Sequence, residues 1–476
     1  MPIPLTRRIA STGLLALLSF ANLADRFGLA GILQKIQSYY SINDSTAGFM
    51  QTVYILVYIA FTVIVSLVGD RLNRKLILVS ANGVWVILML ASSFIPQNFF
   101  WAFISLRSLC SIGNAFTMGL AVSMMGDWFE GQARGYALMV YYWSPPLGNA
   151  IGVITATVLS ESGVEWHWVL RVCPVFATIV LVLIVFIVEE PARGGLESDD
   201  TLATTATIGA IWNDLKAILR VKSFVLAVLA IASNNFVVVS QAWWMPLLLS
   251  HALNFQNSKP NSHVFHGQSY SLIQTLAGLF LAIGGLVGGT VWVWVAQSLK
   301  DGRGCFSRWS SSRSFPLIGA IGTLLALPAT LMAQPSLAVD VWLFYALCFY
   351  DTFIPAGNYV AAMDVLLQVI PSGRRALATS LLYFVASLLG ECTGPYIAGA
   401  ISDVLRGGSA DSEIHFHSLV YALYATGSVF VLCSASFFGA AFFLPRERLD
   451  DQLEKHSSQR KLSNNDSATF TELEKF

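Results

Sequence analysis

Long apolar runs separated by short polar segments dominate this sequence. One helical span needs about 20 apolar residues. By that measure spans cover residues 9–30, 46–68, 75–95, 99–126, 134–159, 168–189, 222–250, 269–297, 315–334, 338–368, 375–403 and 416–444. A bilayer admits only helices and closed barrels, and these runs lack the alternation of barrel strands. The sequence therefore predicts an all-α membrane protein with twelve transmembrane helices, six in each half of the chain.

Composition favours the same class and excludes several others. Of the 476 residues, 55% are hydrophobic and only 12% are charged, too few to cover a soluble globule of this size. The 28 basic and 28 acidic residues balance, so no net field favours nucleic acid. None of the six cysteines stands in a C-x-x-C pair, and we expect no metal site and no cofactor. No catalytic motif is present, so we expect no enzyme.

The chain divides into four parts at changes in composition. We expect an N-terminal six-helix bundle over 1–189, a cytoplasmic linker over 190–221, a C-terminal six-helix bundle over 222–445 and a disordered cytoplasmic tail over 446–476. The linker is rich in Ser, Thr and Asp, with one amphipathic helix expected around 211–219. The tail is polar throughout, which is typical of disorder.

The basic residues predict how the chain lies in the membrane. Most Lys and Arg fall on the side of the two termini, so the positive-inside rule places both termini in the cytoplasm. An even number of spans meets that requirement. The sequon that begins at Asn43 then faces outward or into a lumen, where we expect it to be glycosylated.

A ten-residue segment between the second and third spans, SLVGDRLNRK at 66–75, resembles the hallmark loop G-x-x-x-D-R-x-x-R-K of the major facilitator superfamily, with Ser66 in place of the first glycine. Its aspartate can cap a helix, and its arginines can pair with acidic groups of the same bundle. We expect a latch at the cytoplasmic ends, formed by Asp70, Arg71, Arg74, Asp127 and Arg134. Alternatively, these basic residues only set topology. The matching loop after Lys300 is degraded, which predicts an asymmetric latch.

Further segments are similar to the Spinster family within that superfamily. They run in order along the chain: DRF at 25–27, GDWF at 126–129, WHWVLRVCP at 166–174, IPSGRR at 370–375, LGECTGPY at 389–396 and GAISD at 399–403. The resemblance implies a major facilitator fold of two pseudo-symmetric bundles. It also implies transport of lysophospholipids or sphingoid lipids, including sphingosine 1-phosphate, across the plasma membrane or the lysosomal membrane. Proton coupling is a property of some members.

Charged residues inside the apolar runs are the strongest independent indication of a site. An ionised group at mid-bilayer costs several kcal/mol, about 3 on insertion scales, unless it is paired or faces water. Asp25 and Arg107 lie in spans one and four. The resemblance implies a proton-responsive carboxylate and an arginine that binds a headgroup or pairs with a carboxylate. The alternative is that each pairs only to hold its bundle together, and we expect neighbouring Arg26 to face another way and be structural.

One position departs from the family pattern. Seven residues after Arg107 the family usually has a glutamate, where this chain has Asn114. Because an amide does not titrate, either Asp25 alone carries proton coupling or transport is facilitative.

The second half supplies four more candidates for substrate binding or proton coupling: Asp351, Glu391, Asn234 and Trp243. Asp351 precedes Pro355 and Gly357, which predict a local break in the helix. Asn234 and Trp243 offer a donor and an aromatic wall to a lipid, although Trp is also a common interfacial anchor.

These observations favour a monomeric carrier that moves a single-chain lipid by alternating access, embedded in the bilayer, with protons as a candidate coupling ion. Two alternatives remain at this stage. One is a carrier of a small organic anion or sugar in the same fold, and the other is a membrane receptor or scaffold that transports nothing.

Overall fold

The computed structural model describes residues 4–68, 72–190, 208–257, 264–265, 267–301, 313–371, 374–409, 411–445 and 447. Secondary structure in these ranges is helical, with no strand among them. Ten helical stretches are long and apolar enough to cross a membrane. The long helix α7 (Gly131–Glu161) and the interrupted helix of residues 341–369 complete the set of twelve, so the predicted fold class is confirmed. The candidate latch residues Asp70 and Arg71 and nearly all of the tail lie outside the described ranges.

The N-terminal bundle contains six spans. They are α1 (Leu5–Gly31), α3 (Asp44–Val68), α4 (Arg74–Ser92), the pair α5 (Phe100–Leu109) and α6 (Ser111–Trp128), α7, and α8 (Trp166–Ile187). The short helix α2 (Leu33–Tyr40) joins the first two spans. Pro145 and Pro146 lie inside α7 without ending it. Five of the six spans are long and apolar enough to cross a bilayer, and α7, with 31 residues, is long enough.

The C-terminal bundle repeats this count with more interruptions. Its spans are α10 (Lys222–Asn257), α11 (Tyr270–Asp301), α12 (Ser314–Ser336), α13 (Val341–Phe353) with α14 (Asn358–Val369), α15 (Arg375–Ala386) with α16 (Gly394–Arg406), and α17 (Ser412–Gly427), whose span continues to Pro445. A 3₁₀ turn, η3 (Pro355–Gly357), separates α13 from α14 at the expected break. Helix α9 (Ile208–Arg220) precedes this bundle and covers the predicted amphipathic segment.

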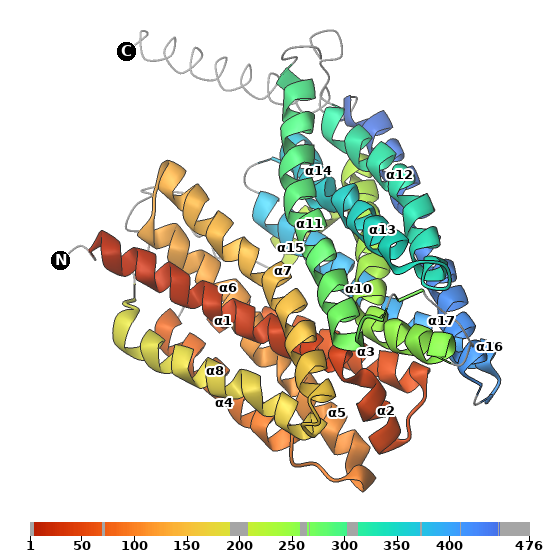
Figure 1. Ribbon diagram of the computed structural model, residues 1–476. Helices are drawn as coiled ribbons and strands as arrows, with labels where there is room; N and C mark the ends of the chain where they lie inside the picture. Colours follow the sequence, from red (N-terminus) through yellow and green to blue (C-terminus); the bar gives the residue numbers. More distant parts are fainter. Residues whose placement is uncertain are drawn as a thin grey trace, which may run out of the picture.

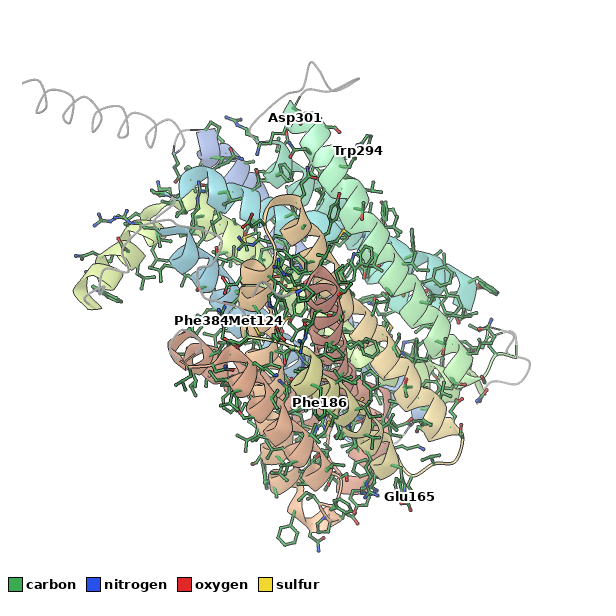
Figure 2. The ribbon with its side chains drawn as sticks, turned by 90° about the vertical axis from the view of Figure 1, so that its left-hand side faces the viewer. Met124, Glu165, Phe186, Trp294, Asp301 and Phe384 are labelled. Carbon is green, nitrogen blue, oxygen red and sulfur yellow. The ribbon has the colours of Figure 1, made fainter. Side chains whose placement is uncertain are left out.

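The two bundles meet at one end and diverge toward the other (Figure 1). We call the end that holds Leu5 and Pro445 the inner end, and the end that holds α2 the outer end. Asp301 and Glu165, labelled in Figure 2, mark the inner and the outer end respectively. At the outer end, one continuous cluster of buried apolar side chains includes both bundles, for example Trp166 and Trp244. Toward the inner end each bundle has its own separate cluster. The structure is therefore closed at the outer end.

Glycines bring α1 and α7 into backbone contact. A Cβ added to Gly152 would lie 2.3 Å from the carbonyl oxygen of Ala24, and one added to Gly148 would lie 2.6 Å from that of Phe20. Small residues allow this approach, which replaces side-chain packing between membrane helices. The contact holds α1, and with it Asp25, against the rest of the N-terminal bundle.

The glycine contact yields a first prediction. Gly152→Ala should destabilise the protein because its methyl group must push the α1 backbone away, and such overpacking costs about 1–3 kcal/mol. Gly83→Ala is the matched control in the same bundle, since nothing lies within 4 Å of its added Cβ. Thermal unfolding of the two purified variants in one detergent measures the difference. Equal melting temperatures would contradict the contact.

Candidate functional site

A buried ion pair lies at mid-height in the N-terminal bundle. The Arg107 Nη2 donates to Asp25 Oδ1 at 2.7 Å, and the Trp85 indole donates to Asp25 Oδ2 at 3.3 Å. Asp25 is 4% exposed and Arg107 is 3% exposed. The pair satisfies the carboxylate but only part of the guanidinium, because Arg107 Nε and Nη1 have no partner among the described residues. Arg107 therefore keeps donors available in a buried position.

A second ion pair crosses from one bundle to the other at the same height. Arg26 follows Asp25 on α1, and a one-residue step turns the side chain by about 100°. Its Nη2 lies 3.2 Å from Glu391 Oε2 in the C-terminal bundle. Turned with its amide oxygen toward Arg26, the Gln51 side chain accepts from Nε at 2.9 Å and from Nη2 at 2.6 Å. Arg26 does face away from Asp25, but it links the bundles, which the sequence did not reveal.

Glu391 occupies the last position of a π-helical turn, η5 (Ser387–Glu391). Pro395 lacks an N–H group, so it cannot bond to the carbonyl of Glu391 four residues earlier, and a wider turn fits this defect. The Asn235 amide donates to Glu391 Oε1 at 3.3 Å, and the Tyr359 hydroxyl donates to Asn235 at 2.8 Å. The acidic candidate Glu391 is therefore held toward the other bundle by a local helix defect and an amide.

The remaining candidates of the second half lie away from these two pairs. Asp351 accepts a hydrogen bond from Thr330 inside the C-terminal bundle. Asn234 accepts from the Asn358 amide at 2.9 Å within the same bundle. Trp243 is fully buried in the outer apolar cluster. The candidates Asp25 and Arg107 therefore form one ion pair, and Glu391 forms the other with Arg26. Asp351, Asn234 and Trp243 lie elsewhere.

Asn114 lies in the interior of the N-terminal bundle, on α6. It is 4% exposed, and its amide oxygen has no partner among the described residues. A network of Asn22, Asn82 and Thr117 lies nearby on α1, α4 and α6, with the Asn22 amide donating to Asn82 at 3.1 Å. Asn114 therefore adds an unused acceptor to a region that is already polar but not charged.

Arg74 anchors the inner end of the N-terminal bundle. Its guanidinium lies 2.5 Å from Asp127 and 3.4 Å from Glu190, and it donates to Ser123 at 2.7 Å. Glu190 also accepts from the backbone N–H groups of Arg74 and Lys75, which caps α4. Three elements are tied together in this way, and the capping carboxylate, Glu190, is the third residue after the end of α8.

Two further features complete the inner end. The Arg134 guanidinium lies beside Gly126, with Nη2 3.2 Å from the position of an added Cβ. In the C-terminal bundle, Lys300 Nζ lies 2.5 Å from Asp364 Oδ1. The degraded loop after Lys300 led us to expect an asymmetric latch. Lys300, at the end of α11, nevertheless pairs with a carboxylate, because its partner Asp364 lies on α14, outside the loop motif.

A group of polar contacts joins the bundles at the outer end, and we call it the outer clamp. Asp403 on α16 accepts from the backbone N–H groups of Asp44 at 3.0 Å and Ser45 at 2.7 Å, at the start of α3. Arg406 Nη2 lies 2.6 Å from Asp403 and 3.3 Å from Asp44. Ser402 donates to Asp44 at 2.8 Å. A carboxylate thus caps a helix of the opposite bundle, where the helix dipole favours negative charge.

Close backbone packing continues below the outer clamp. A Cβ added to Gly48 would lie 2.4 Å from the Pro395 carbonyl oxygen, and one added to Gly399 would lie 2.4 Å from that of Asp44. The Thr52 hydroxyl donates to the Cys392 carbonyl one turn deeper, at 2.5 Å. Hydrogen bonds between described residues of the two bundles lie at the outer end or at mid-height.

Two bundles of six helices, charged groups at mid-height and a polar contact at one end define a secondary transporter of the major facilitator type. The sequence model of the Major Facilitator Superfamily matches residues 15–395 of this chain. Protein spinster homolog 1 from Homo sapiens is 30% identical over 441 residues, which cover 92% of this chain and 81% of that protein. The chain belongs to the Spinster family.

A second relative agrees with that family, and a solved structure agrees with the fold. The Sphingosine-1-phosphate transporter SPNS2 of Mus musculus is 32% identical over 443 residues, which cover 91% of this chain and 77% of that protein. A crystal structure of a bacterial homolog to the human lysosomal transporter Spinster, inward-facing and unoccupied, superposes with a TM-score of 0.75 at 19% identity. The match covers 94% of this chain and 99% of that one, and it confirms the fold.

The outer clamp yields a second prediction. In a variant whose sole cysteine is Cys392, the thiol should react slowly with a water-soluble maleimide, because it is 4% exposed and lies 3.8 Å from the Thr52 carbonyl oxygen of the other bundle. Asp403→Asn removes the capping charge and should raise the rate several-fold. Asp340→Asn is the control, since Asp340 caps α13 within its own bundle. An unchanged rate in Asp403→Asn would show that the clamp does not hold the outer end closed.

Proposed function

We propose that this protein is a secondary transporter that moves a single-chain lipid, such as a lysophospholipid or sphingosine 1-phosphate, across a membrane by alternating access. The observation that carries the proposal is Arg107, a buried guanidinium at mid-height that spends one nitrogen on Asp25 and leaves Nε and Nη1 without described partners. A phosphate would bind one of these two nitrogens together with Nη2, the nitrogen that holds Asp25, because the bidentate edges of a guanidinium both include Nη2. The named function of the SPNS2 relative supports a phosphate-bearing lipid as the substrate.

Asp25 and Arg107 would act together on such a headgroup. A phosphate that binds the unused donors competes with the Asp25 carboxylate for the same guanidinium. Protonation of Asp25 would weaken its hold on Arg107 and favour the phosphate. Because Asn114 does not titrate, we assign proton coupling to Asp25. If the transport rate does not depend on pH, the same mechanism operates as facilitated transport without proton coupling.

Alternating access requires the contacts between the bundles to exchange. Opening of the outer end must break the outer clamp and separate Arg26 from Glu391. Arg26 would then need another anion in the apolar interior, and a bound phosphate near mid-height provides one. The inner latch at Arg74 and Asp127 lies within one bundle, so it can persist while the bundles rock. We propose that Arg71, Arg134 and Asp70 complete it.

The charge distribution supports an orientation for this cycle. We propose that the inner end, with both termini, faces the cytoplasm, in the plasma membrane or the lysosomal membrane. Asn43 is exposed at the outer end, beside the clamp, and would carry a glycan there. A monomer is the proposed unit, since one chain contains both bundles.

A second candidate is a carrier of small organic anions. The unused donors of Arg107 fit a carboxylate or a soluble phosphate as well as a lipid. Apolar protein surface favours a lipid over a small organic anion, since only the acyl chain of a lipid is stabilised by contact with it. A receptor or scaffold that transports nothing is the third candidate, and it predicts no movement of any substrate.

The third prediction tests the central pair. Cells that express the wild type should move labelled lysophosphatidylcholine or sphingosine 1-phosphate. Arg107→Ala should abolish transport, and Arg107→Lys should lose most of it because the bidentate fork is absent. Asp25→Asn should remove the difference between acidic and neutral pH. Asp364→Asn, at the inner end of the C-terminal bundle, is the control and should retain the pH response.

The outcomes separate the candidates. If the wild type reaches its membrane and moves organic anions but neither lipid, the proposed cargo is wrong and the second candidate holds. If nothing moves, the chain acts as a receptor or scaffold. Full activity of Arg107→Ala would remove the guanidinium from the mechanism.

A fourth prediction concerns the pair between the bundles. Arg26→Glu and Glu391→Arg should each slow lipid transport at least tenfold, because each leaves two like charges facing one another in an apolar region. The double exchange restores opposite charges and should recover part of the rate. A double variant no better than the worse single one would show that the ion pair has no role in the cycle.

A further inference from the structure

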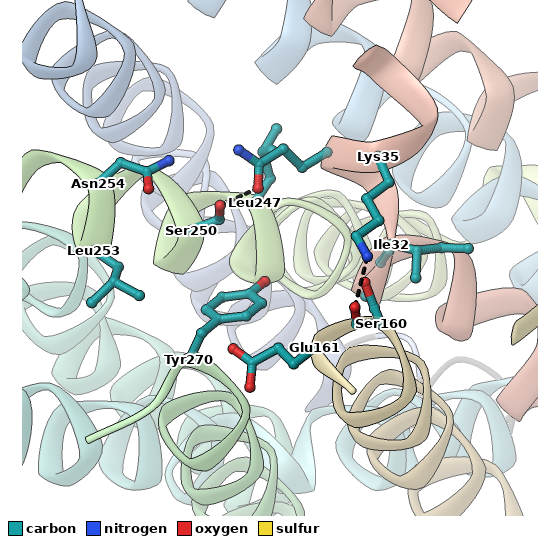
Figure 3. A pocket seen from close by; sticks show the side chains of 12 residues that line it. Ile32, Lys35, Ser160, Glu161, Leu247, Ser250, Leu253, Asn254 and Tyr270 are labelled. Carbon is teal, nitrogen blue, oxygen red and sulfur yellow. Dashed lines mark hydrogen bonds between the residues drawn. The ribbon is translucent and has the colours of Figure 1, made fainter. Parts of the chain in front are cut away.

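A cavity of about 220 Å³ lies at the outer end, between the bundles and apart from the central pairs. Four segments line it: the junction of α1 and α2, the end of α7, the outer part of α10 and the start of α11 (Figure 3). Drug-sized sites usually occupy about 300–1,000 Å³. The volume here is too small for a whole lipid and suits a headgroup.

Two opposite charges face this cavity without pairing. Lys35 Nζ donates to the Ser160 carbonyl oxygen at 2.7 Å, and no carboxylate of the described chain lies within ion-pair distance of it. Glu161 forms no hydrogen bond or ion pair with a described residue, and its carboxylate stands beside the Tyr270 ring in Figure 3. Both residues line the cavity, and both are exposed. The wall therefore offers one unneutralised cation and one unneutralised anion.

The opposite wall belongs to the C-terminal bundle. The Ser250 hydroxyl donates to the Gln34 amide oxygen across the cavity, which ties the two walls together. Tyr270 donates its hydroxyl to the Pro246 carbonyl at 2.8 Å, which fixes the ring beside Glu161. Leu247 and Leu253 supply apolar surface. A ligand with a phosphate and an ammonium group satisfies both charges at once, and an aromatic ring adds attraction for the ammonium.

We propose that this cavity is a second, outer site for the headgroup of a zwitterionic single-chain phospholipid, with the phosphate on Lys35 and the ammonium between Glu161 and Tyr270. The assignment rests on the proposed function for its substrate class. Apolar side chains on the adjoining turns of α7 and α11 point outward, with Val158 41% exposed and Leu272 45% exposed. An acyl chain would lie along them in the bilayer while the headgroup occupies the cavity.

The position of the site links its occupancy to the transport cycle. Lys35 and Glu161 belong to one bundle, whereas Ser250 and Tyr270 belong to the other. Opening of the outer end pulls these walls apart, so the complete site exists only while that end is closed. A ligand that binds one of two states shifts the equilibrium toward it. A zwitterionic lipid at the outer end would therefore favour the outer-closed state.

Binding of labelled lysophosphatidylcholine to the full chain in phosphatidylglycerol nanodiscs tests the site, because that bilayer contains no ammonium group. The measurement uses an Arg107→Ala background, which disables the central site. We expect saturable binding that Lys35→Ala weakens at least tenfold. Glu161→Gln should weaken binding of lysophosphatidylcholine but not of lysophosphatidylglycerol, which has no ammonium. Glu130→Gln, an exposed carboxylate at the inner end, is the matched control.

Each outcome decides one claim. Binding that is absent, or insensitive to both Lys35 and Glu161, overturns the outer site. Sensitivity to Lys35 alone, equal for both lipids, overturns the zwitterion and leaves a simple anion site. Soluble glycerophosphocholine that binds as tightly as the lysolipid would show that no acyl chain is recognised and would overturn the lipid assignment. If the wild type transports no lipid but this binding is intact, the proposed function fails and the outer site stands.

Discussion

An ionised group in the apolar interior must be paired, and this constraint at Asp25 and Arg107 determines how the rest of the molecule is arranged. Loss of either partner would leave a buried charge at a cost of about 3–5 kcal/mol. The pair fixes α1 against α5, and glycines in α7 hold α1 from the other side. Arg26, one residue further on, is then turned toward the second bundle. A single helix thereby carries both the candidate binding group and the connection between bundles.

The contacts at the two ends differ in kind, and that difference supports a rocking carrier. The outer clamp and Arg26–Glu391 join the bundles, so they must break when the outer end opens. Arg74–Asp127 and Lys300–Asp364 lie within single bundles and stiffen each as a unit. Rigid units with a few exchangeable polar contacts between them can interconvert with small free-energy changes. The proposed headgroup site at Lys35 and Glu161 adds a place where bound lipid can shift the equilibrium between these states.

Sequence alone predicted much of this arrangement, for identifiable physical reasons. Apolar run length fixes the number of helices, and Pro355 with Gly357 fixes a break. Charge in an apolar run pointed to Asp25, Arg107 and Glu391, because membrane burial is costly wherever it occurs. The same rule included Asp351, which the structure satisfies with Thr330 inside its bundle. A charged residue in an apolar run shows that it needs a partner. It does not show whether that partner lies in the same bundle or in the other one.

The contacts between the bundles could not be predicted from the sequence. Asp403 belongs to a segment that resembles the Spinster family, and Asp44 belongs to a sequon. Neither pattern indicates that the two residues meet across the interface between the bundles. Such pairing joins residues about 360 positions apart, and it depends on packing that a single chain does not reveal. Arg26 was assigned a structural role for the same reason. Its neighbour on the helix was visible in the sequence, but its partner on η5 was not.

We propose that lipid binding at Arg107 drives the bundles to rock. Double electron–electron resonance measures it most directly, with spin labels at Glu130 and Gln297 on the inner ends and, in a second sample, at Ser38 and Glu413 on the outer ends. All four positions are exposed. In a Lys35→Ala background, which removes the outer site, added lysolipid should shift the inner pair toward shorter distances and the outer pair toward longer ones, and Arg107→Ala should abolish both shifts. Distances that do not change when lipid is added, or that change equally without Arg107, would show that lipid binding at Arg107 does not drive the rocking.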